Sequence, residues 1–377
     1  MRGTRRKRTG ERNLSPPIYR TVINNPLEIQ QNISLAPLTT LKIGGLARFF
    51  VHAETEHQVI EAFQYSKSEG LKLFVLGGGS NILVSDEGFD GLVLQIGLKG
   101  ILSNGESGMR NAESIKAANP IHITAQAGED WDEFVRYCVT RNLSGIECLS
   151  GIPGFVGGTP VQNVGAYGQD VSETIVSVRC FDRENAKPVD LTNADCGFEY
   201  RTSIFNTSVR DRYIVLSVTY SLVEDGPPKI AYKDLKEFFA KREPTLNETR
   251  DAVLRIRAEK SMVIDTDDPN SQSAGSFFKN PVVARNALDA IGENVPHFEV
   301  DADHVKIPAA WLIENAGFFK GFAMGTAGIS TRHSLAIVNR GDATAKDVLA
   351  LKDRIVFEVK EKFGIELKPE PIFVGFD

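Results

Sequence analysis

Three consecutive glycines follow an apolar run in the stretch "FVLGGGSNILVSDEGFDGLVL" (residues 74–94). Glycine loses more conformational freedom on folding than other residues, so Gly77, Gly78 and Gly79 indicate a need for bare backbone. A glycine loop after a strand lets backbone N–H groups approach a phosphate closely, and the Ser-Asn pair that follows adds donors. The loop lacks the Gly-Lys-Ser/Thr of a Walker A motif, and Leu83 takes the third glycine position of G-x-G-x-x-G. A phosphate-binding loop and a tight turn that binds nothing therefore both stay open.

Strand and helix patterns alternate around this loop. A helix is predicted between Thr55 and Gly70, because Thr55 and Gln58 form a capping-box pattern and Gly70 suits the position after a helix end. The apolar runs at 71–76, before the glycines, and at 91–96, farther along the chain, predict strands. Residues 40–96 therefore predict a compact α/β unit of strand, helix, strand, glycine loop and strand.

A second glycine-rich loop, "GIPGFVGGTPVQNVGAYG" (residues 151–168), carries no charged residue. It lies in a unit that opens near residue 101, with a strand at 121–126 and a helix capped by Asp130 and Glu133. Two glycine loops in adjacent units predict one elongated cofactor between them, such as a pyrophosphate with an aromatic and a sugar end. Later strands are predicted at 173–182, 187–192 and 212–223, and later helices at 247–260 and 344–364.

Composition excludes several functional classes. The chain has 377 residues and a formal net charge of −6, although residues 1–13 are strongly basic. An acidic body argues against nucleic acid as the main partner. The sequence shows no run of about 18 apolar residues and no secretory signal, so we expect neither a membrane partner nor secretion. The tail is expected to be disordered and solvated, with contact to an acidic surface as the alternative.

The cysteines and histidines do not indicate a metal site. No C-x-x-C or H-E-x-x-H pattern occurs, so we expect buried free thiols in a reducing cytoplasm and no metal. The oligomeric state stays open, with a monomer favoured. The four cysteines are Cys138, Cys148, Cys180 and Cys196.

Five motifs in this order carry a family resemblance: "GGGSNILV", "GIPGFVGGTPVQNVGAYG", "YRTSIF", "AGSFFKNP" and "LKPEPIF". Together they resemble the UDP-N-acetylenolpyruvoylglucosamine reductase family, over residues 38–375. The resemblance implies an α+β chain with a two-lobed FAD-binding fold of the vanillyl-alcohol-oxidase (PCMH) type and a C-terminal α/β substrate-binding domain. The implied parts are a disordered basic tail (1–17), FAD-binding lobe 1 (18–100), FAD-binding lobe 2 (101–261), a substrate-binding domain (262–365) and a C-terminal segment returning to the active site (366–377).

The family chemistry implied by the resemblance has two halves. NADPH reduces FAD, and the reduced flavin passes hydride to the enolpyruvyl ether of UDP-N-acetylglucosamine. The product is UDP-N-acetylmuramate, a cytoplasmic precursor of peptidoglycan. The expected partner is therefore this small-molecule substrate, the cofactor is FAD, and NADPH is the co-substrate.

The resemblance assigns three catalytic residues. Arg201 contacts the substrate carboxylate, where a planar guanidinium fork fits well; an ordinary ion pair with Glu199 is the alternative. Ser276 is the proton donor to the enolate, although a serine after glycine is usually a turn residue. Glu370 assists enolate formation or protonation, which requires a protonated carboxyl; an exposed turn carboxylate is the alternative.

The resemblance also assigns binding residues. Tyr232 matches a tyrosine in a loop that closes over substrate in one subgroup of the family. Lys260 matches a contact to the nicotinamide cofactor or the substrate diphosphate, and Arg257 a position near the FAD pyrophosphate; both also suit a helix C-terminus. The expected cofactor-binding residues are Gly77, Gly78, Gly79, Ser80, Asn81, Ile152, Pro153, Gly157, Gly158, Thr159, Gly165 and Arg257. The expected substrate-binding residues are Tyr200, Tyr232, Lys260, Asn280 and Asn315.

Two other functions compete with the reductase. One is an FAD-dependent sugar or hydroxy-acid oxidase of the same fold, although no histidine signature for covalent flavin attachment occurs in the glycine loop. The other is a non-catalytic nucleotide-sugar-binding module, which would leave "YRTSIF", "AGSFF" and "PEP" without a shared purpose.

Overall fold

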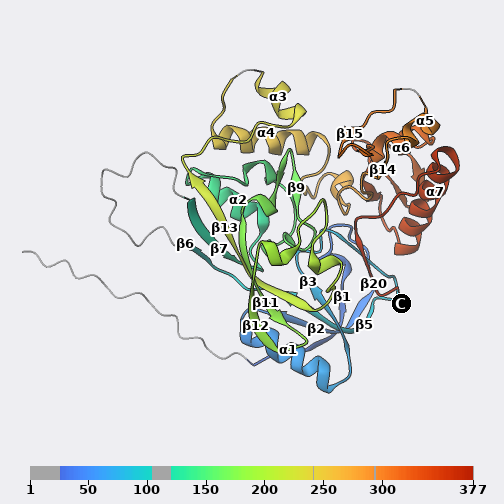
Figure 1. Cartoon of the computed structure of the whole chain (residues 1–377). Helices are drawn as coiled ribbons and strands as arrows, with labels where there is room; N and C mark the ends of the chain where they lie inside the picture. The colour runs from blue at the N-terminus through green and yellow to red at the C-terminus, as the bar shows by residue number, and fades with distance from the viewer. Residues whose placement is uncertain (1–25, 104–119, 241, 293, 377) are drawn as a thin grey trace, which may run out of the picture.

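The computed structural model describes residues 26–103, 120–240, 242–292 and 294–376. The predicted basic tail (1–17) and residues 104–119 therefore lie outside the described residues. The described chain forms a strand-rich body and a smaller C-terminal part beside it (Figure 1). No helix within the described ranges is long and apolar enough to cross a membrane.

The first sheet has the strand order β1-β2-β5-β3. β5 lies between β2 and β3 and is parallel to both, while β1 is antiparallel to β2. Helix α1 (Glu56–Ser68) connects β2 to β3, and the Thr55 side chain accepts a hydrogen bond from Gln58 N, as predicted. The strands are β1 (Gln30–Ser34), β2 (Leu46–Ala53), β3 (Lys72–Leu76) and β5 (Phe89–Ile96).

The second sheet is antiparallel, with the order β12-β11-β13-β7-β6 and β8 paired to β13. Asp130 caps the N-terminus of helix α2 (Trp131–Val139), and its side chain accepts a hydrogen bond from Glu133 N, as predicted. Helices α3 (Lys233–Phe239) and α4 (Leu246–Glu259) lie at one end of this sheet (Figure 1). The strands are β6 (Ile101–Ser103), β7 (Pro120–Gln126), β8 (Leu143–Ser144), β11 (Ile175–Asp182), β12 (Lys187–Thr192) and β13 (Tyr213–Glu224), with a hairpin of β9 (Gly165–Ala166) and β10 (Gln169–Asp170) nearby.

The C-terminal part combines two small antiparallel sheets with three helices. The long helix α7 (Ala345–Phe363) ends at Gly364, which has a left-handed φ of 68°, as its sequence predicts. The elements are β14 (Val282–Ala284), α5 (Ala287–Ile291), β15 (Phe298–Glu299), β16 (His304–Lys306), α6 (Ala309–Asn315), β17 (Ala323–Met324), β18 (Ala327–Ile329), β19 (Ile337–Asn339) and α7.

After α7 the chain returns to the first sheet region. Strand β20 (Ile372–Val374) pairs in parallel with β4 (Ile82–Val84), which follows the three glycines. Other contacts fix the C-terminal part against residues 35–90. Thr40 Oγ1 donates to Ser273 O at 2.6 Å, and the Asp86 carboxylate accepts from two backbone N–H groups at the start of α7.

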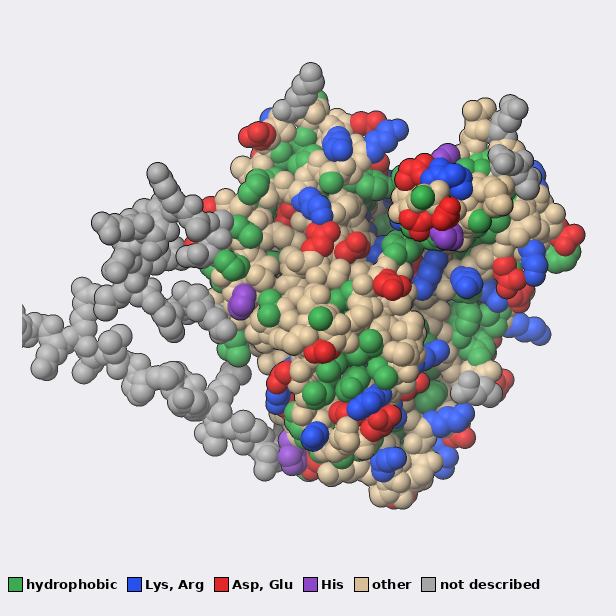
Figure 2. Space-filling view, in the orientation of Figure 1, with side chains coloured by type: hydrophobic (Ala, Val, Ile, Leu, Met, Phe, Trp, Pro, Cys, Tyr) green, Lys and Arg blue, Asp and Glu red, His purple; other side chains and the backbone are tan. Residues whose placement is uncertain are grey.

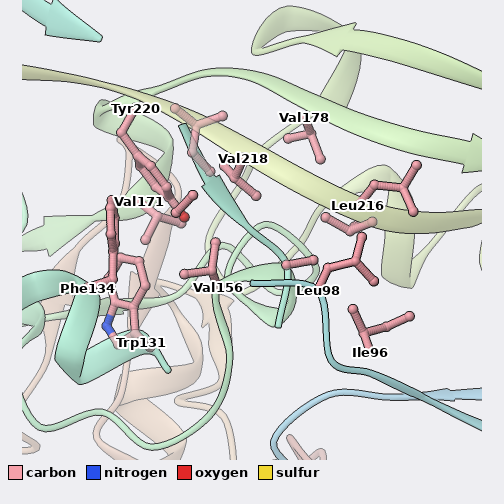
Figure 3. Packing of buried hydrophobic residues seen from close by; sticks show 14 of the residues in the cluster. Ile96, Leu98, Trp131, Phe134, Val156, Val171, Val178, Leu216, Val218 and Tyr220 are labelled. Carbon is pink, nitrogen blue, oxygen red and sulfur yellow. The ribbon is translucent and has the colours of Figure 1, made fainter. Parts of the chain in front are cut away.

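The largest hydrophobic cluster spans both sheets. It extends from Val51 in β2 to Leu246 at the start of α4, so the two sheets share one core. Figure 3 shows Trp131 and Phe134 beside Tyr220, whose ring is fully buried. A second cluster fills the C-terminal part and includes Phe277 and Phe278.

All four cysteines are free and buried, as the sequence predicts. Burial raises the pKa of each thiol, and for Cys196 the value is about 12. These thiols stay protonated at neutral pH, so they contribute apolar packing and not nucleophiles.

Gly79→Ala should lower the free energy of unfolding by about 2–4 kcal/mol, whereas Gly70→Ala should cost about 1 kcal/mol. Both glycines are left-handed, with φ of 65° and 63°. A Cβ at Gly79 would lie 2.0 Å from Leu38 O, while a Cβ at Gly70 would meet nothing within 4 Å. Comparing the two variants by urea denaturation separates collision from backbone strain. Equal losses would contradict the close packing of Gly79.

Candidate functional site

The three consecutive glycines have three different environments. Gly79 is left-handed and packs on the backbone at Leu38. A Cβ at Gly78 would lie 2.7 Å from Gly154 Cα, so Gly78 lets the two predicted glycine loops touch. A Cβ at Gly77 would meet nothing within 4 Å, and Gly77 is the position where bare backbone faces open space. The tight-turn explanation therefore holds for Gly79, and Gly77 is left as the candidate for ligand contact.

The second glycine loop shows the same division of roles. A Cβ at Gly157 would lie 2.7 Å from Ala127 Cβ, whereas Gly158 is exposed and a Cβ there would meet nothing within 4 Å. The Thr159 hydroxyl is hydrogen-bonded to the Tyr220 hydroxyl at 2.8 Å and is buried. Thr159 thus anchors the loop to the core and presents Gly158 outward.

Asn81 connects three segments of the chain. Its amide donates to Gln162 Oε1 in the second glycine loop and to Glu370 O at 3.4 Å. Ile372 N in turn donates to Asn81 O at 3.0 Å. Ser80 lies at the contact between the loops, because its Oγ is 2.7 Å from where a Gly154 Cβ would be. The structure gives Asn81 a positioning contact with Glu370 that the sequence did not predict.

Arg201 lies where the second glycine loop meets the C-terminal segment. Its guanidinium donates to Asn163 O at 3.3 Å and to Gly165 O, and its Nε lies 3.5 Å from Glu370 Oε1. The alternative pairing with Glu199 is wrong, since Glu199 forms backbone hydrogen bonds with Thr202 and the guanidinium points away to Glu370. Arg201 also has a left-handed φ of 55°. Strained backbone of this kind clusters at functional sites.

Gly165 packs closely against Asp170 and Arg201, and its contact with the cofactor stays a prediction. A Cβ there would lie 1.6 Å from Asp170 Oδ1 and 3.0 Å from Arg201 Nη1. Its carbonyl accepts from Arg201. The missing side chain at Gly165 therefore makes room first for the Asp170 carboxylate and then for the Arg201 guanidinium.

Glu370 is mostly buried, with 14% of its side chain exposed. Burial raises the pKa of its carboxyl, and the positive charges of Arg201 and Lys279 oppose that rise. Its backbone N–H donates to Phe277 O at 2.9 Å, so the segment carrying Glu370 lies directly against the one carrying Ser276. The alternative of an exposed turn carboxylate is wrong.

Ser276 lies half-buried beside a histidine that the sequence did not single out. Its Oγ is 3.2 Å from His333 Nε2. Burial, together with the positive charges of Lys260, Lys320 and Arg257, lowers the pKa of His333 to about 4. Since the two residues are 57 positions apart, no local pattern could have joined them.

A group of cations and tyrosines lies at the end of α4. Lys260 Nζ pairs with Asp234 Oδ2 at 2.7 Å; burial alone would lower the pKa of Lys260, but this pairing raises it overall. Tyr232, which is 42% exposed, packs edge-on against Tyr167 with ring centroids 5.5 Å apart. Figure 2 shows the surface hollowed between the part that carries α3 and α4 and the C-terminal part.

Arg257 is buried beside the second glycine loop. Its Nη2 donates to Met262 O at 2.7 Å, while its Nε has no hydrogen-bond partner among the described residues. The same Nε lies 3.3 Å from where a Gly151 Cβ would be. Arg257 is thus a buried cation beside Gly151 of the second glycine loop, and its contact with a cofactor diphosphate stays a prediction.

The remaining predicted substrate contacts differ from one another. Tyr200 is 42% exposed and lies under Lys306 Nζ, 4.3 Å from the ring centroid, and 5.5 Å from the Arg201 guanidinium carbon. Asn280 uses its side-chain oxygen to accept from Ala309 N at 2.8 Å, which caps α6. Asn315 donates to Trp311 O at the other end of that helix. The structure thus brings Tyr200 to the site and gives Asn280 and Asn315 structural contacts.

Ile152 and Pro153 lie half-buried between the left-handed Gly151 and Gly154. Gly154, which follows them, is the residue that meets Gly78. Among the described residues, no group of three or more His, Cys, Asp or Glu side chains could hold a metal ion.

Comparisons with known proteins agree on one family. A family model described as "UDP-N-acetylenolpyruvoylglucosamine reductase, C-terminal domain" matches residues 267–374, and a second, described as "FAD binding domain", matches residues 47–192. A UDP-N-acetylenolpyruvoylglucosamine reductase from Thermobifida fusca is 42% identical over 359 residues, which is 92% of this chain and 98% of that protein. Another from Streptomyces coelicolor is 40% identical and covers 93% of this chain and 91% of that protein.

A solved structure supports the same assignment. The crystal structure of UDP-N-acetylenolpyruvylglucosamine reductase from Thermus caldophilus aligns with a TM-score of 0.62 and 26% identity, over 92% of this chain and 99% of that one. The predicted FAD-binding fold with an added C-terminal domain is therefore confirmed. The chain is a member of the UDP-N-acetylenolpyruvoylglucosamine reductase family, which consists of FAD-containing oxidoreductases.

Proposed function

We propose that this chain reduces the enolpyruvyl ether of UDP-N-acetylglucosamine to UDP-N-acetylmuramate for peptidoglycan synthesis in the cytoplasm, with NADPH as the electron donor. One observation carries the proposal. Arg201, Ser276 and Glu370 come from three distant segments, yet backbone and side-chain contacts join all three beside the paired glycine loops. Such a cluster suits a substrate that carries a carboxylate and must accept a proton.

Each part of the chain receives a role in this proposal. Residues 18–100 and 101–261 form the two FAD-binding lobes, residues 262–365 bind the substrate, and residues 366–377 return Glu370 to the site. The backbone of Gly77 and Gly158 would hold the diphosphate of FAD. When bound, FAD accepts hydride from the nicotinamide and passes it to the substrate.

The catalytic residues act on the substrate itself. Arg201 holds the substrate carboxylate by its guanidinium fork and stabilises the negative charge that builds up when hydride reaches the neighbouring methylene carbon. Ser276 donates a proton to the carbon next to that carboxylate. Burial raises the pKa of Glu370, and its protonation beside the same carboxylate would remove the like-charge repulsion between the two groups.

The substrate diphosphate is assigned to the cations at the end of α4. Lys260 is held by Asp234 in the structure, and a diphosphate would compete with that carboxylate for the ammonium group. Tyr232 lies two residues before Asp234, so release of Asp234 from Lys260 would free the segment that carries the Tyr232 ring to close over the substrate. Phe277 and Phe278, which follow Ser276 in the chain, belong to the hydrophobic core of the C-terminal part and anchor this segment there.

Anaerobic mixing tests the function directly. NADPH should bleach the flavin absorbance of the purified protein, and UDP-N-acetylglucosamine enolpyruvate should restore it with formation of UDP-N-acetylmuramate. NADH in the same experiment measures the nucleotide preference. Recovery of the absorbance with oxygen but not with the enolpyruvyl sugar would favour an oxidase and contradict the proposal.

Gly77→Val should leave the protein folded and weaken FAD binding by tenfold or more, which is about 1.4 kcal/mol. The added side chain meets no protein atom within 4 Å of its Cβ, but it fills the space assigned to the cofactor diphosphate. The ratio of flavin to protein absorbance and the dissociation constant for FAD measure the effect, with Gly70→Ala as the control. Wild-type affinity in Gly77→Val would place the diphosphate elsewhere.

A further inference from the structure

The hydrogen bond between Ser276 and His333 joins two segments that the backbone holds in fixed register. His333 lies in the turn between β18 and β19, where Ala336 N donates to His333 O at 3.1 Å. Phe277 N, next to Ser276, donates to Leu335 O at 2.8 Å. Backbone hydrogen bonds therefore hold the two segments side by side, with Ser276 Oγ 3.2 Å from His333 Nε2.

The surroundings of His333 keep its ring neutral. Arg257 and Lys260 face it from the end of α4, and Lys320 faces it from the segment between α6 and β17. These cations and burial lower the pKa of His333 to about 4, so an imidazolium is absent at neutral pH. A neutral imidazole carries one N–H donor and one acceptor nitrogen.

The tautomer decides what Ser276 can do. If Nε2 were the acceptor, the serine hydroxyl would donate to the histidine, and its proton would point away from a substrate. If Nε2 carries the proton, Nε2 donates to Ser276 Oγ, and the hydroxyl proton of Ser276 is free to turn toward the substrate. Only the second arrangement suits a serine that gives its proton away.

We propose that His333 is a positioning residue for proton donation: its Nε2–H holds Ser276 Oγ and leaves the hydroxyl proton directed at the substrate. The inference rests on the proposed role of Ser276. In the step, the O–H bond of Ser276 breaks as a C–H bond forms on the substrate carbon. The negative charge left on Oγ is stabilised by the Nε2–H donor, and Oγ regains a proton from solvent water.

Two variants of the FAD-loaded enzyme test the inference by stopped-flow absorbance of the flavin. His333→Leu should reduce the rate of flavin reoxidation by the enolpyruvyl sugar on the order of 10²-fold, as expected for the loss of one charge-stabilising donor. Flavin reduction by NADPH should keep its wild-type rate. His333→Gln should recover most of the reoxidation rate, because its amide N–H can take the place of Nε2–H.

A double variant separates this role from general support of the fold. In a Ser276→Ala background, His333→Leu should have no further effect on reoxidation, because residues that act as a unit are not additive. Slow reoxidation in Ser276→Ala with a wild-type rate in His333→Leu would overturn the inference and leave the proposed function standing. Wild-type reoxidation in Ser276→Ala itself would instead overturn the proposed role of the serine.

A measurement on the unmutated protein covers the case that His333→Leu does not fold. Nitrogen-15 NMR of histidine-labelled holoenzyme at neutral pH distinguishes the two neutral tautomers and the imidazolium, with His333→Gln providing the assignment. The expected signal is a neutral ring protonated at Nε2. A ring protonated at Nδ1 alone, or a charged ring, would overturn the inference.

Discussion

Ser276→Ala should slow flavin reoxidation by the enolpyruvyl substrate roughly 10²–10⁴-fold, the usual loss when a positioned general acid is removed. Hydride delivery builds negative charge on the substrate, and without a proton the reaction reverses. The substitution removes one hydroxyl from a half-buried site, so folding and FAD binding should survive. Flavin reduction by NADPH should stay near normal, because that half-reaction needs no proton from Ser276.

Stopped-flow absorbance resolves both halves in one experiment. Ser276→Cys should recover part of the lost rate, since a thiol can also donate a proton. Ser273→Ala is the matched control, because Ser273 Oγ lies in the same loop and accepts from Gly275 N at 3.3 Å. If Ser276→Ala slows both halves equally, or neither, Ser276 is a structural residue.

Arg201→Lys should lower kcat/KM for the enolpyruvyl sugar on the order of 10²-fold, although the charge is kept. The guanidinium contacts Asn163 O, Gly165 O and the Glu370 carboxylate at once. A single ammonium cannot reproduce these contacts and also form a fork with the substrate carboxylate. Steady-state kinetics with varied substrate measures the loss.

Arg212→Lys is the matched control for Arg201→Lys. Arg212 forms a fork with the Asp182 carboxylate, at 3.2 and 2.8 Å, on β11 and outside the site. That variant should lose the same fork with no change in kcat/KM. A wild-type kcat/KM in Arg201→Lys would contradict the prediction and show that Arg201 forms only a structural ion pair.

The parts of the fold that depend on neighbours in sequence could be predicted. Thr55, Asp130 and Gly364 mark helix ends because a cap bonds within three or four residues of itself. The strands of the second sheet follow from alternation over six or more residues. Strand β4 was not predicted, since three apolar residues after a glycine loop show no period and gain their strand character from the distant β20.

The site could be predicted only through family resemblance. Nothing local marks Ser276 as an acid, and its partner His333 is brought to it by the C-terminal fold. Local reasoning paired Arg201 with Glu199, two residues away, whereas the chain places Glu370 against it. The glycine loops show the same limit, because the sequence could not tell that Gly78 meets Gly154 while Gly77 faces open space.

The parallel pairing of β4 with β20 has a consequence for how the protein is made. Asn81 and Glu370 are 289 positions apart, so at about 5–20 residues per second a ribosome needs about 15–60 s between them. During that interval the nascent chain carries β4 without its partner, with three apolar side chains and an open strand edge. Open edges invite pairing with other chains. Newly made protein is therefore most prone to aggregation, and most dependent on chaperones, before β20 is synthesised.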